Sequence, residues 1–182
     1  MTDQKITLKY VLTLIIVVFI TWIIHEFAHW LTNESLGYET IMRLNGTSTI
    51  KGKNPTDLHN IISSSAGPII TIIQGLVAYV LLKFRNWNKC IYAFLFTAFF
   101  MRFLASLMNF IMLNDEGRIS VYLKLGIFTL PIIVSGILFY MVYKISRKYN
   151  LKWKFHILTS VILLIAVTGL IFIDQYFKIR IL

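Results

Sequence analysis

The segment His25-Glu26-Phe27-Ala28-His29 contains three side chains whose types and spacing could hold a metal ion and activate water. In a helix the two histidines lie one turn apart on one face, so their ring nitrogens can converge on one ion. Glu26 follows the first histidine and can reach the open position of that ion, where a carboxylate can take a proton from water. Paired imidazoles with a third ligand and one open position are typical of zinc. The segment therefore predicts Zn²⁺ on His25 and His29, with Glu26 as the catalytic base.

This metal-binding pattern lies near the end of an apolar stretch that runs from Leu8 to Leu31. From Leu8 to His25 a helix rises roughly 25 Å, which places His25 near the far membrane interface but still at hydrocarbon depth. One charged side chain at mid-depth costs about 3 kcal/mol, so a function is the expected reason for placing ionisable residues there. The alternative is a cluster at the helix end in which both histidines bond to neighbours and hold no metal.

The composition is that of a membrane protein. Of 182 residues, 57% are hydrophobic and 14% are charged, and the mean hydropathy is +0.72; a soluble domain has about 25% charged residues. The net charge of +10 does not indicate nucleic acid binding, because the basic residues gather at the ends of apolar segments, where they meet lipid headgroups. Cys90 is the single cysteine, so the chain has neither an intrachain disulfide nor a cysteine metal cluster.

Five apolar segments are long enough to cross the bilayer as helices, because about 20 residues suffice. They predict an all-α, multi-pass protein of the cell membrane, with spans at about 8–31, 59–83, 90–113, 122–143 and 155–177. Residues 1–120 contain the metal-binding pattern and three of these spans, and residues 121–182 contain the other two.

A short β-hairpin is predicted between the first two spans. Residues alternate in character from Tyr38 to Leu44 and from Thr47 to Ile50 around the turn signal Asn45-Gly46, and Lys51-Gly52 is a second turn signal. The alternative is an unstructured surface loop. The edge of such a hairpin, beside the metal site, could hold an extended substrate as an added strand.

A third metal ligand must come from another helix end on the same side of the membrane. Five antiparallel crossings bring several candidates there: Asp57, His59, Asp115, Glu116 and Asp174. His156 starts the last span on the opposite side. Asp115 and Glu116 are both favoured over Asp174, because both follow a helix with a polar residue, Asn109, inside it; of the two, Asp115 is favoured. Asp174 is a further alternative, although Lys178 and Arg180 could pair with it.

Two other polar features lie inside the spans. Small residues in Ser63-Ser64-Ser65-Ala66-Gly67 allow a close approach to the first helix, and Pro68 favours a kink. This face of the second span is expected to pack against the first helix and to leave room near the metal; ordinary packing is the alternative. Arg102, in the third span, is expected to snorkel or to pair with an acid.

The chain resembles the site-2 protease family of intramembrane zinc metalloproteases. In that family a core of three transmembrane helices carries His-Glu-x-x-His on the first helix, Gly-Pro on the second and Asn…Asp-Gly on the third. The matching residues are His25 to His29, Ala66-Gly67-Pro68, and Asn109…Asp115. The resemblance covers about residues 8–120. It differs at Thr71, where the family usually has Asn, and at Glu116, which intervenes before Gly117.

The resemblance implies a zinc-dependent endopeptidase that cleaves a transmembrane or membrane-proximal segment of a membrane-anchored protein or peptide. His25, His29 and Asp115 would be the zinc ligands and Glu26 the base, with Asn109, Gly67 and Pro68 in supporting positions. Two alternatives stay open. One is a membrane metalloprotease that takes a downstream glutamate as third ligand. The other is a non-catalytic protein, such as a metal transporter or an assembly scaffold, that uses the histidine pair.

The orientation in the membrane has two opposing indications. With the N-terminus in the cytoplasm, about ten basic residues outside the spans lie on the cytoplasmic side and about seven on the other. The positive-inside rule favours this topology, in which the metal site faces outward. The resemblance implies the reverse, because members of the family typically cut near the cytoplasmic face.

Overall fold

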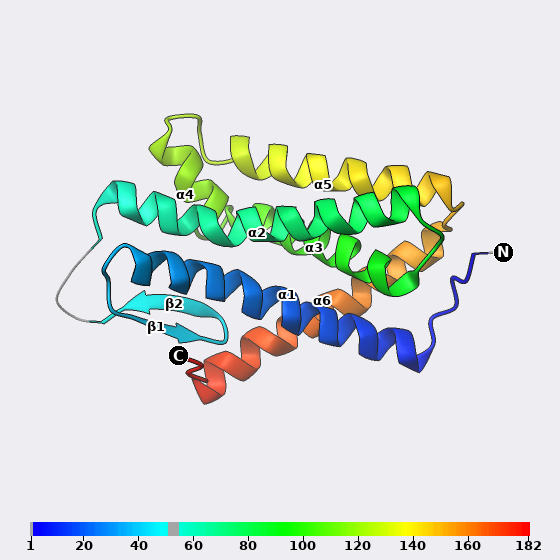
Figure 1. Ribbon diagram of the computed structural model, residues 1–182, viewed down its shortest axis with the longest axis horizontal. Helices are drawn as coiled ribbons and strands as arrows, with labels where there is room; N and C mark the ends of the chain where they lie inside the picture. The colour runs from blue at the N-terminus through cyan, green and yellow to red at the C-terminus, as the bar shows by residue number, and fades with distance from the viewer. Residues whose placement is uncertain (1, 51–54) are drawn as a thin grey trace.

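A computed structural model describes residues 2–50 and 55–182, and within these ranges the chain forms six helices and a two-stranded antiparallel sheet (Figure 1). Five of these described helices are long and apolar enough to cross a membrane: α1 (Leu8–Ser35), α2 (Asp57–Phe84), α3 (Lys89–Met108), α5 (Thr129–Lys148) and α6 (Trp153–Phe177). The remaining helix, α4 (Asp115–Tyr122), is short. Helix α6 crosses α1 obliquely, whereas α1, α2 and α5 run alongside one another.

The predicted spans match α1, α2 and α6 to within a few residues, but the third predicted span is wrong at its C-terminal end and the fourth is wrong at both ends. The third was expected to reach residue 113, and α3 ends at Met108. The fourth was expected at 122–143, and α5 occupies Thr129–Lys148. Helix α4, which lies between α3 and α5, was not predicted.

Local polar bonds explain why α3 stops early. The side-chain oxygen of Asn109 accepts a hydrogen bond from the backbone N–H of Asn114 at 2.9 Å, and its amide donates to the carbonyl of Ala105 at 3.0 Å. Side-chain bonds of this kind compete with helix continuation. After α4, Lys124 and Gly126 have φ of 58° and 85°, values that end a helix. The chain therefore restarts at α5.

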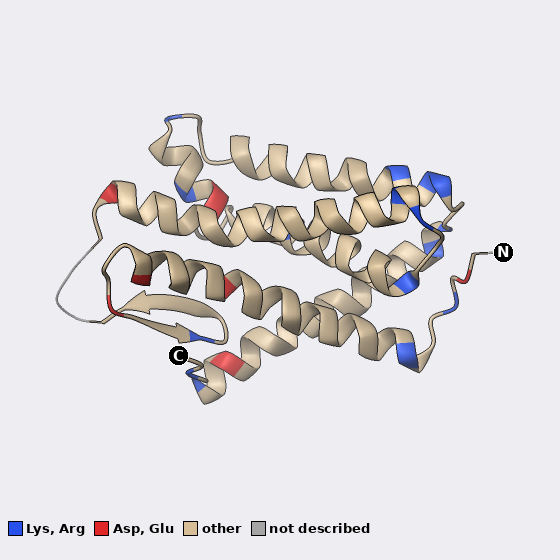
Figure 2. Ribbon diagram, viewed as in Figure 1, with Lys and Arg blue, Asp and Glu red and all other residues tan. Residues whose placement is uncertain are grey.

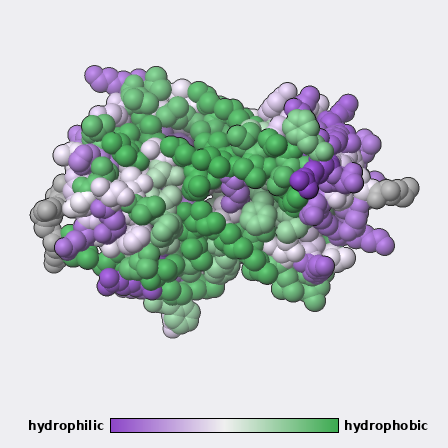
Figure 3. All heavy atoms as spheres, in the orientation of Figure 1, coloured by the Kyte–Doolittle hydropathy of each residue, from purple (hydrophilic) through white to green (hydrophobic). Residues whose placement is uncertain are grey.

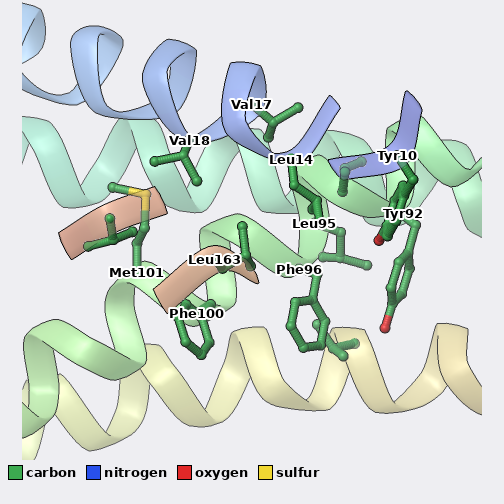
Figure 4. Close-up of a cluster of buried hydrophobic side chains, with 14 of the residues drawn as sticks. Tyr10, Leu14, Val17, Val18, Tyr92, Leu95, Phe96, Phe100, Met101 and Leu163 are labelled. Atoms are coloured by element: carbon green, nitrogen blue, oxygen red, sulfur yellow. The ribbon is translucent and has the colours of Figure 1, made fainter. Parts of the chain in front are cut away.

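An apolar core packs the long helices against one another (Figure 4). Along α1 the buried side chains recur every three or four residues, as expected for one face of a helix. Their first members, Tyr10, Leu14, Val17 and Val18, belong to the same cluster as Tyr92, Leu95 and Phe96 of α3 and Leu163 of α6. This core fixes how α1 lies against α3 and α6. It therefore also determines which side of α1 faces the bundle interior beyond Val18.

The outer surface has an apolar middle and polar ends (Figure 3). Large apolar side chains point outward from the long helices; Leu12, Ile16 and Ile73 are each about half exposed. Lysine and arginine residues gather at the end that holds the N-terminus (Figure 2). A broad apolar surface between charged ends is suited to a lipid bilayer.

The hairpin predicted after the first helix is confirmed as β1 (Thr40–Arg43) and β2 (Gly46–Thr49). Arg43 pairs with Gly46, so the turn is Leu44-Asn45, one residue earlier than the predicted Asn45-Gly46. The second predicted turn, at Lys51-Gly52, lies outside the described residues. On the other side of β1 the C-terminus is bonded to the strand. The N–H of Met42 donates to the carbonyl of Leu182 at 3.0 Å, and the N–H of Ile181 donates to the carbonyl of Met42 at 2.8 Å.

Candidate metal centre

The buried face of α1 changes from apolar to polar halfway along the helix. After Val18 the buried residues of this helix are Thr21, His25, Glu26, His29 and Asn33. The histidines thus lie on the same face as the core residues and point into the bundle. Because the core fixes that face, the two imidazoles need no separate element to aim them inward.

His25, His29 and Asp115 converge on one point. The Nε2 atoms of the two imidazoles are 3.1 Å apart, and Oδ2 of Asp115 is 3.2 Å from Nε2 of His25 and 3.5 Å from Nε2 of His29. Three ligands of a tetrahedral zinc ion are separated by roughly 3.3 Å, given bond lengths near 2.05 Å. Among the described residues, His25, His29 and Asp115 therefore form a group that could hold a metal ion.

The partners on the far side of each imidazole set its tautomer. Nδ1 of His29 lies 2.7 Å from the carbonyl oxygen of Ser63, which can only accept, so Nδ1 is the donor. Nδ1 of His25 lies 3.1 Å from the hydroxyl of Thr71, whose own hydrogen is donated to the carbonyl of Gly67 at 3.0 Å. Nδ1 of His25 is therefore also a donor. Both Nε2 atoms then direct lone pairs at each other and at a carboxylate, an arrangement that suits a cation between them.

Asp115 reaches the imidazoles because α4 begins there. Asn114 precedes the helix and Asp115 is its first residue, a position where the helix dipole favours an acid. The bonds of Asn109 hold Asn114 against the end of α3. This position directs the Asp115 carboxyl at Nε2 of both imidazoles, where it can bind a cation.

Arg102 pairs with Glu116, one of the two outcomes expected for it. The guanidinium lies 3.2 Å from one carboxylate oxygen of Glu116 and 3.3 Å from the other, and 3.7 Å from Oδ2 of Asp115. Both Arg102 and Glu116 are buried. The pair links α3 to α4 directly beside Asp115, and it occupies Glu116, which was an alternative third ligand.

The other candidates for the third ligand lie elsewhere. Asp174 is buried on α6, and its Oδ1 has no hydrogen-bond partner among the described residues. Asp57 is in the first turn of α2. His59 bonds through Nδ1 to the hydroxyl of Tyr38 at 2.7 Å. None of these three belongs to the converging group in the described part of the chain.

Small residues on α2 allow this helix to approach the histidines closely. A Cβ added at Gly67 would lie 2.6 Å from Nε2 of His25 and in direct collision with Nε2 of His29. Ser63, Gly67 and Thr71 recur every four residues on this buried face, and two of them are the Nδ1 partners described above. Pro68, which stays within α2, is buried beside them. The predicted close approach of this face is confirmed. Ser63 and Thr71 were not predicted as histidine partners, although their spacing from Gly67 could have revealed them.

A cavity of about 940 Å³ opens onto the metal-site residues. It is bordered by His25, Glu26, His29 and Asp115, by strand β2 and by residues of α3 and α6. The hydroxyl of Thr47 in β2 donates to the backbone carbonyl of Glu26 at 3.3 Å, which keeps the strand against this part of α1. The Glu26 carboxylate, the three converging side chains and strand β2 thus border one space.

Comparisons of the chain with protein-family models, with curated proteins and with solved structures found no match. The function is therefore argued from the geometry and chemistry of the site.

Thr71 is expected to support metal binding through His25. In Thr71→Val the Nδ1–H of His25 loses its acceptor, and loss of such a partner typically weakens metal affinity about 10- to 100-fold. Competition with a chromophoric chelator measures this affinity. Thr71→Ser keeps the hydroxyl and should bind the metal like the unsubstituted protein. Equal affinity in all three proteins would contradict the role of Thr71.

The stability of the protein is expected to depend on Arg102 and Glu116 being present together. Arg102→Met or Glu116→Leu alone leaves one buried charge without its partner, which costs about 3–5 kcal/mol. The double substitution removes both charges and should lose less stability than the two single changes added together. Thermal unfolding of the purified protein in detergent micelles provides the comparison; additive losses would mean that the two charges do not depend on each other.

Proposed function

We propose that this chain is a multi-pass protein of the cell membrane and a zinc-dependent endopeptidase of the site-2 protease type. The observation that supports this proposal most directly is the convergence of His25, His29 and Asp115 next to Glu26 in one cavity. Two neutral imidazoles and one carboxylate leave a position open in a four-ligand site, as catalytic zinc sites do. The cavity lies in a bundle whose outer surface suits lipid, so a membrane-anchored substrate could approach it from the bilayer.

The chain's own residues divide the chemistry between them. His25, His29 and Asp115 hold the ion, and Thr71 and Ser63 fix the tautomers that direct Nε2 toward it. Zn²⁺, when bound, supplies Lewis acidity that makes water easier to deprotonate and polarises a peptide carbonyl. Glu26 takes the proton from the attacking water and gives it to the leaving amine, so it is unchanged after the peptide bond is broken.

The substrate must be extended at the bond that is cut, because the hydrogen bonds of an intact helix protect its peptide groups. Strand β2 offers a place for an extended segment. Arg43 pairs with Gly46 next to the turn, and the N–H of Ile50 donates to the carbonyl of Glu39 at 2.8 Å. This alternation directs the N–H and C=O groups of Thr47 and Thr49 away from β1. Since β2 borders the cavity, its outer edge can pair with the substrate.

Thr49→Pro is expected to slow cleavage while preserving the hairpin. Proline removes an N–H from the outer edge of β2 and none from the β1–β2 ladder, and such edge positions tolerate it. Loss of one backbone hydrogen bond to the substrate should reduce kcat/KM by about three- to tenfold. The control is Thr49→Ala, which keeps the N–H and should cleave normally. If both variants cleave a model substrate equally fast, the edge of β2 does not bind the substrate.

The proposed function is tested by activity and metal content together. The purified protein is reconstituted in lipid vesicles with a membrane-anchored model peptide, and the products are identified by mass spectrometry. We expect one zinc ion per chain, cleavage within or beside the membrane segment, loss of cleavage with a chelator, and recovery with Zn²⁺. Stoichiometric zinc without cleavage of any of a panel of membrane peptides would favour the transporter or scaffold alternative. A comparison of membrane proteomes with and without active Glu26 would then identify natural substrates.

The orientation is decided by a reporter fused after Leu182. The charge count favours an N-terminus in the cytoplasm, and five crossings would then put the C-terminus outside. A reporter that is active only outside the cytoplasm should therefore give a signal. A signal from a cytoplasmic reporter would put the metal site on the cytoplasmic side.

A further inference from the structure

A second cavity, of about 460 Å³, lies at the opposite end of the bundle from the hairpin. It is formed between the C-terminal ends of α2 and α5, and no acidic residue borders it in the described part of the chain. The residues around it are four cations, two tyrosines and one buried aliphatic side chain: Lys83, Lys144, Arg147, Lys148, Tyr79, Tyr143 and Ile145.

No acidic side chain among residues 2–50 and 55–182 pairs with the cations of this basic cavity. Lys148 has a structural role, because its ammonium group donates to the backbone carbonyls of Leu82 and Lys83 at 3.1 and 2.7 Å and so joins the end of α5 to the end of α2. The Lys144 ammonium lies 5.8 Å from the ring centre of Tyr140, and Lys83 lies 5.9 Å from that of Tyr79. These contacts hold the cations in place without cancelling their charge.

The position of the cavity along the bundle matches the headgroup region of a membrane. Both helices end there, and tyrosines and basic residues are typical of the interface where a spanning helix leaves the hydrocarbon. Basic cavities between spanning helices at this depth bind anionic headgroups. We propose that the cavity between α2 and α5 is a binding site for a phosphate group, as carried by an anionic phospholipid. This inference rests on the membrane placement proposed above but not on peptidase activity.

The energetics of the site come mainly from charge. Each Lys or Arg near an anionic surface contributes about a fivefold increase in binding. Lys144 and Arg147 are the best residues to remove, because both are exposed and neither side chain makes a hydrogen bond to another described residue. Replacing both by Gln should weaken the binding of a phosphate group roughly 30-fold.

The test uses the full chain in detergent micelles, titrated with phosphatidylglycerol, phosphatidylcholine or inorganic phosphate and followed by native mass spectrometry and thermal unfolding. The pocket variant is Lys144→Gln with Arg147→Gln. Its matched control is Lys152→Gln with Lys154→Gln, which removes the same charge at the same end of the protein from exposed positions that do not border the cavity.

We expect phosphatidylglycerol to stay bound and to raise the unfolding midpoint, phosphatidylcholine to do neither, and only the pocket variant to lose the effect. Binding of inorganic phosphate at comparable concentration, lost in the same variant, would support the site but identify free phosphate as its ligand. Equal loss in the pocket variant and in the control would reduce the effect to overall charge and overturn the proposal. The proposal would also be overturned if neither phosphatidylglycerol nor inorganic phosphate bound to the protein. Metal content and peptide cleavage are measured on the same variants, so failure here is distinguishable from failure of the peptidase.

Discussion

Glu26→Gln is expected to retain one metal ion per chain and to cleave peptide at least about 100-fold more slowly than the unsubstituted protein. The amide has nearly the same shape as the carboxylate but cannot accept a proton from water, and general-base catalysis contributes about 10²- to 10⁴-fold. Glu26 is not one of the three converging ligands, so the ion should stay. Metal analysis by plasma mass spectrometry and cleavage of a reconstituted membrane peptide give the two measurements.

The matched control for this result is His29→Ala, which should lose the metal as well as the activity, because it removes one of two imidazole ligands. The pair of variants separates chemistry from metal binding. Cleavage that survives in Glu26→Gln would remove Glu26 from the mechanism. Loss of metal from Glu26→Gln would mean that the carboxylate is a ligand and not a base.

Gly67→Ala is expected to have a large effect from a single added methyl group. The new Cβ would collide with Nε2 of His29 and lie 2.5 Å from Cε1 of His25, so the imidazoles or the whole of α2 must move. Overpacking of this kind costs about 1–3 kcal/mol of stability. Displaced ligands should also weaken metal affinity at least about tenfold, as loss of ligand orientation does. Chelator competition and thermal unfolding measure the two losses.

Two glycines elsewhere in the same protein provide the control. A Cβ at Gly136 of α5 or at Gly169 of α6 would meet nothing within 4 Å. In a helix, alanine at such a site stabilises the protein by about 0.4–1 kcal/mol, since it restricts the unfolded chain. Gly136→Ala and Gly169→Ala should therefore keep full metal affinity. If Gly67→Ala behaves as they do, α2 does not lie against the histidines as described.

The part of the site that could be predicted from the sequence is the part that lies on one helix. The spacing of His25 and His29 is set by helical geometry alone, since residues four apart always share a face. The apolar run around them made the helix certain to form, and α1 begins at Leu8 as expected. The hairpin was also predictable because its turn signal and alternation are local, although the register is shifted by one residue.

The prediction of Asp115 as third ligand rested on an incorrect helix boundary. Asp115 was favoured on the assumption that it follows a long third helix, but α3 ends at Met108 and Asp115 begins a separate helix. The hydrogen bond between Asn109 and the backbone of Asn114 contributes to this break, and it joins residues five positions apart. Such a bond leaves no periodic pattern in the sequence, so it could not be predicted. Asp115 reaches the imidazoles for a different reason from the one expected.

Local sequence patterns were enough to predict five helices long and apolar enough to span a bilayer, a hairpin, and two imidazoles on one face of a helix. These depend on neighbours within a few residues, so a pattern of spacing records them. The packing of the helices brings Thr71 and Ser63 to the imidazoles, pairs Arg102 with Glu116, and places Asp115 within reach of both histidines. Each of these contacts joins different helices, and the packing of side chains across the whole bundle, not local propensity, selects which residues meet.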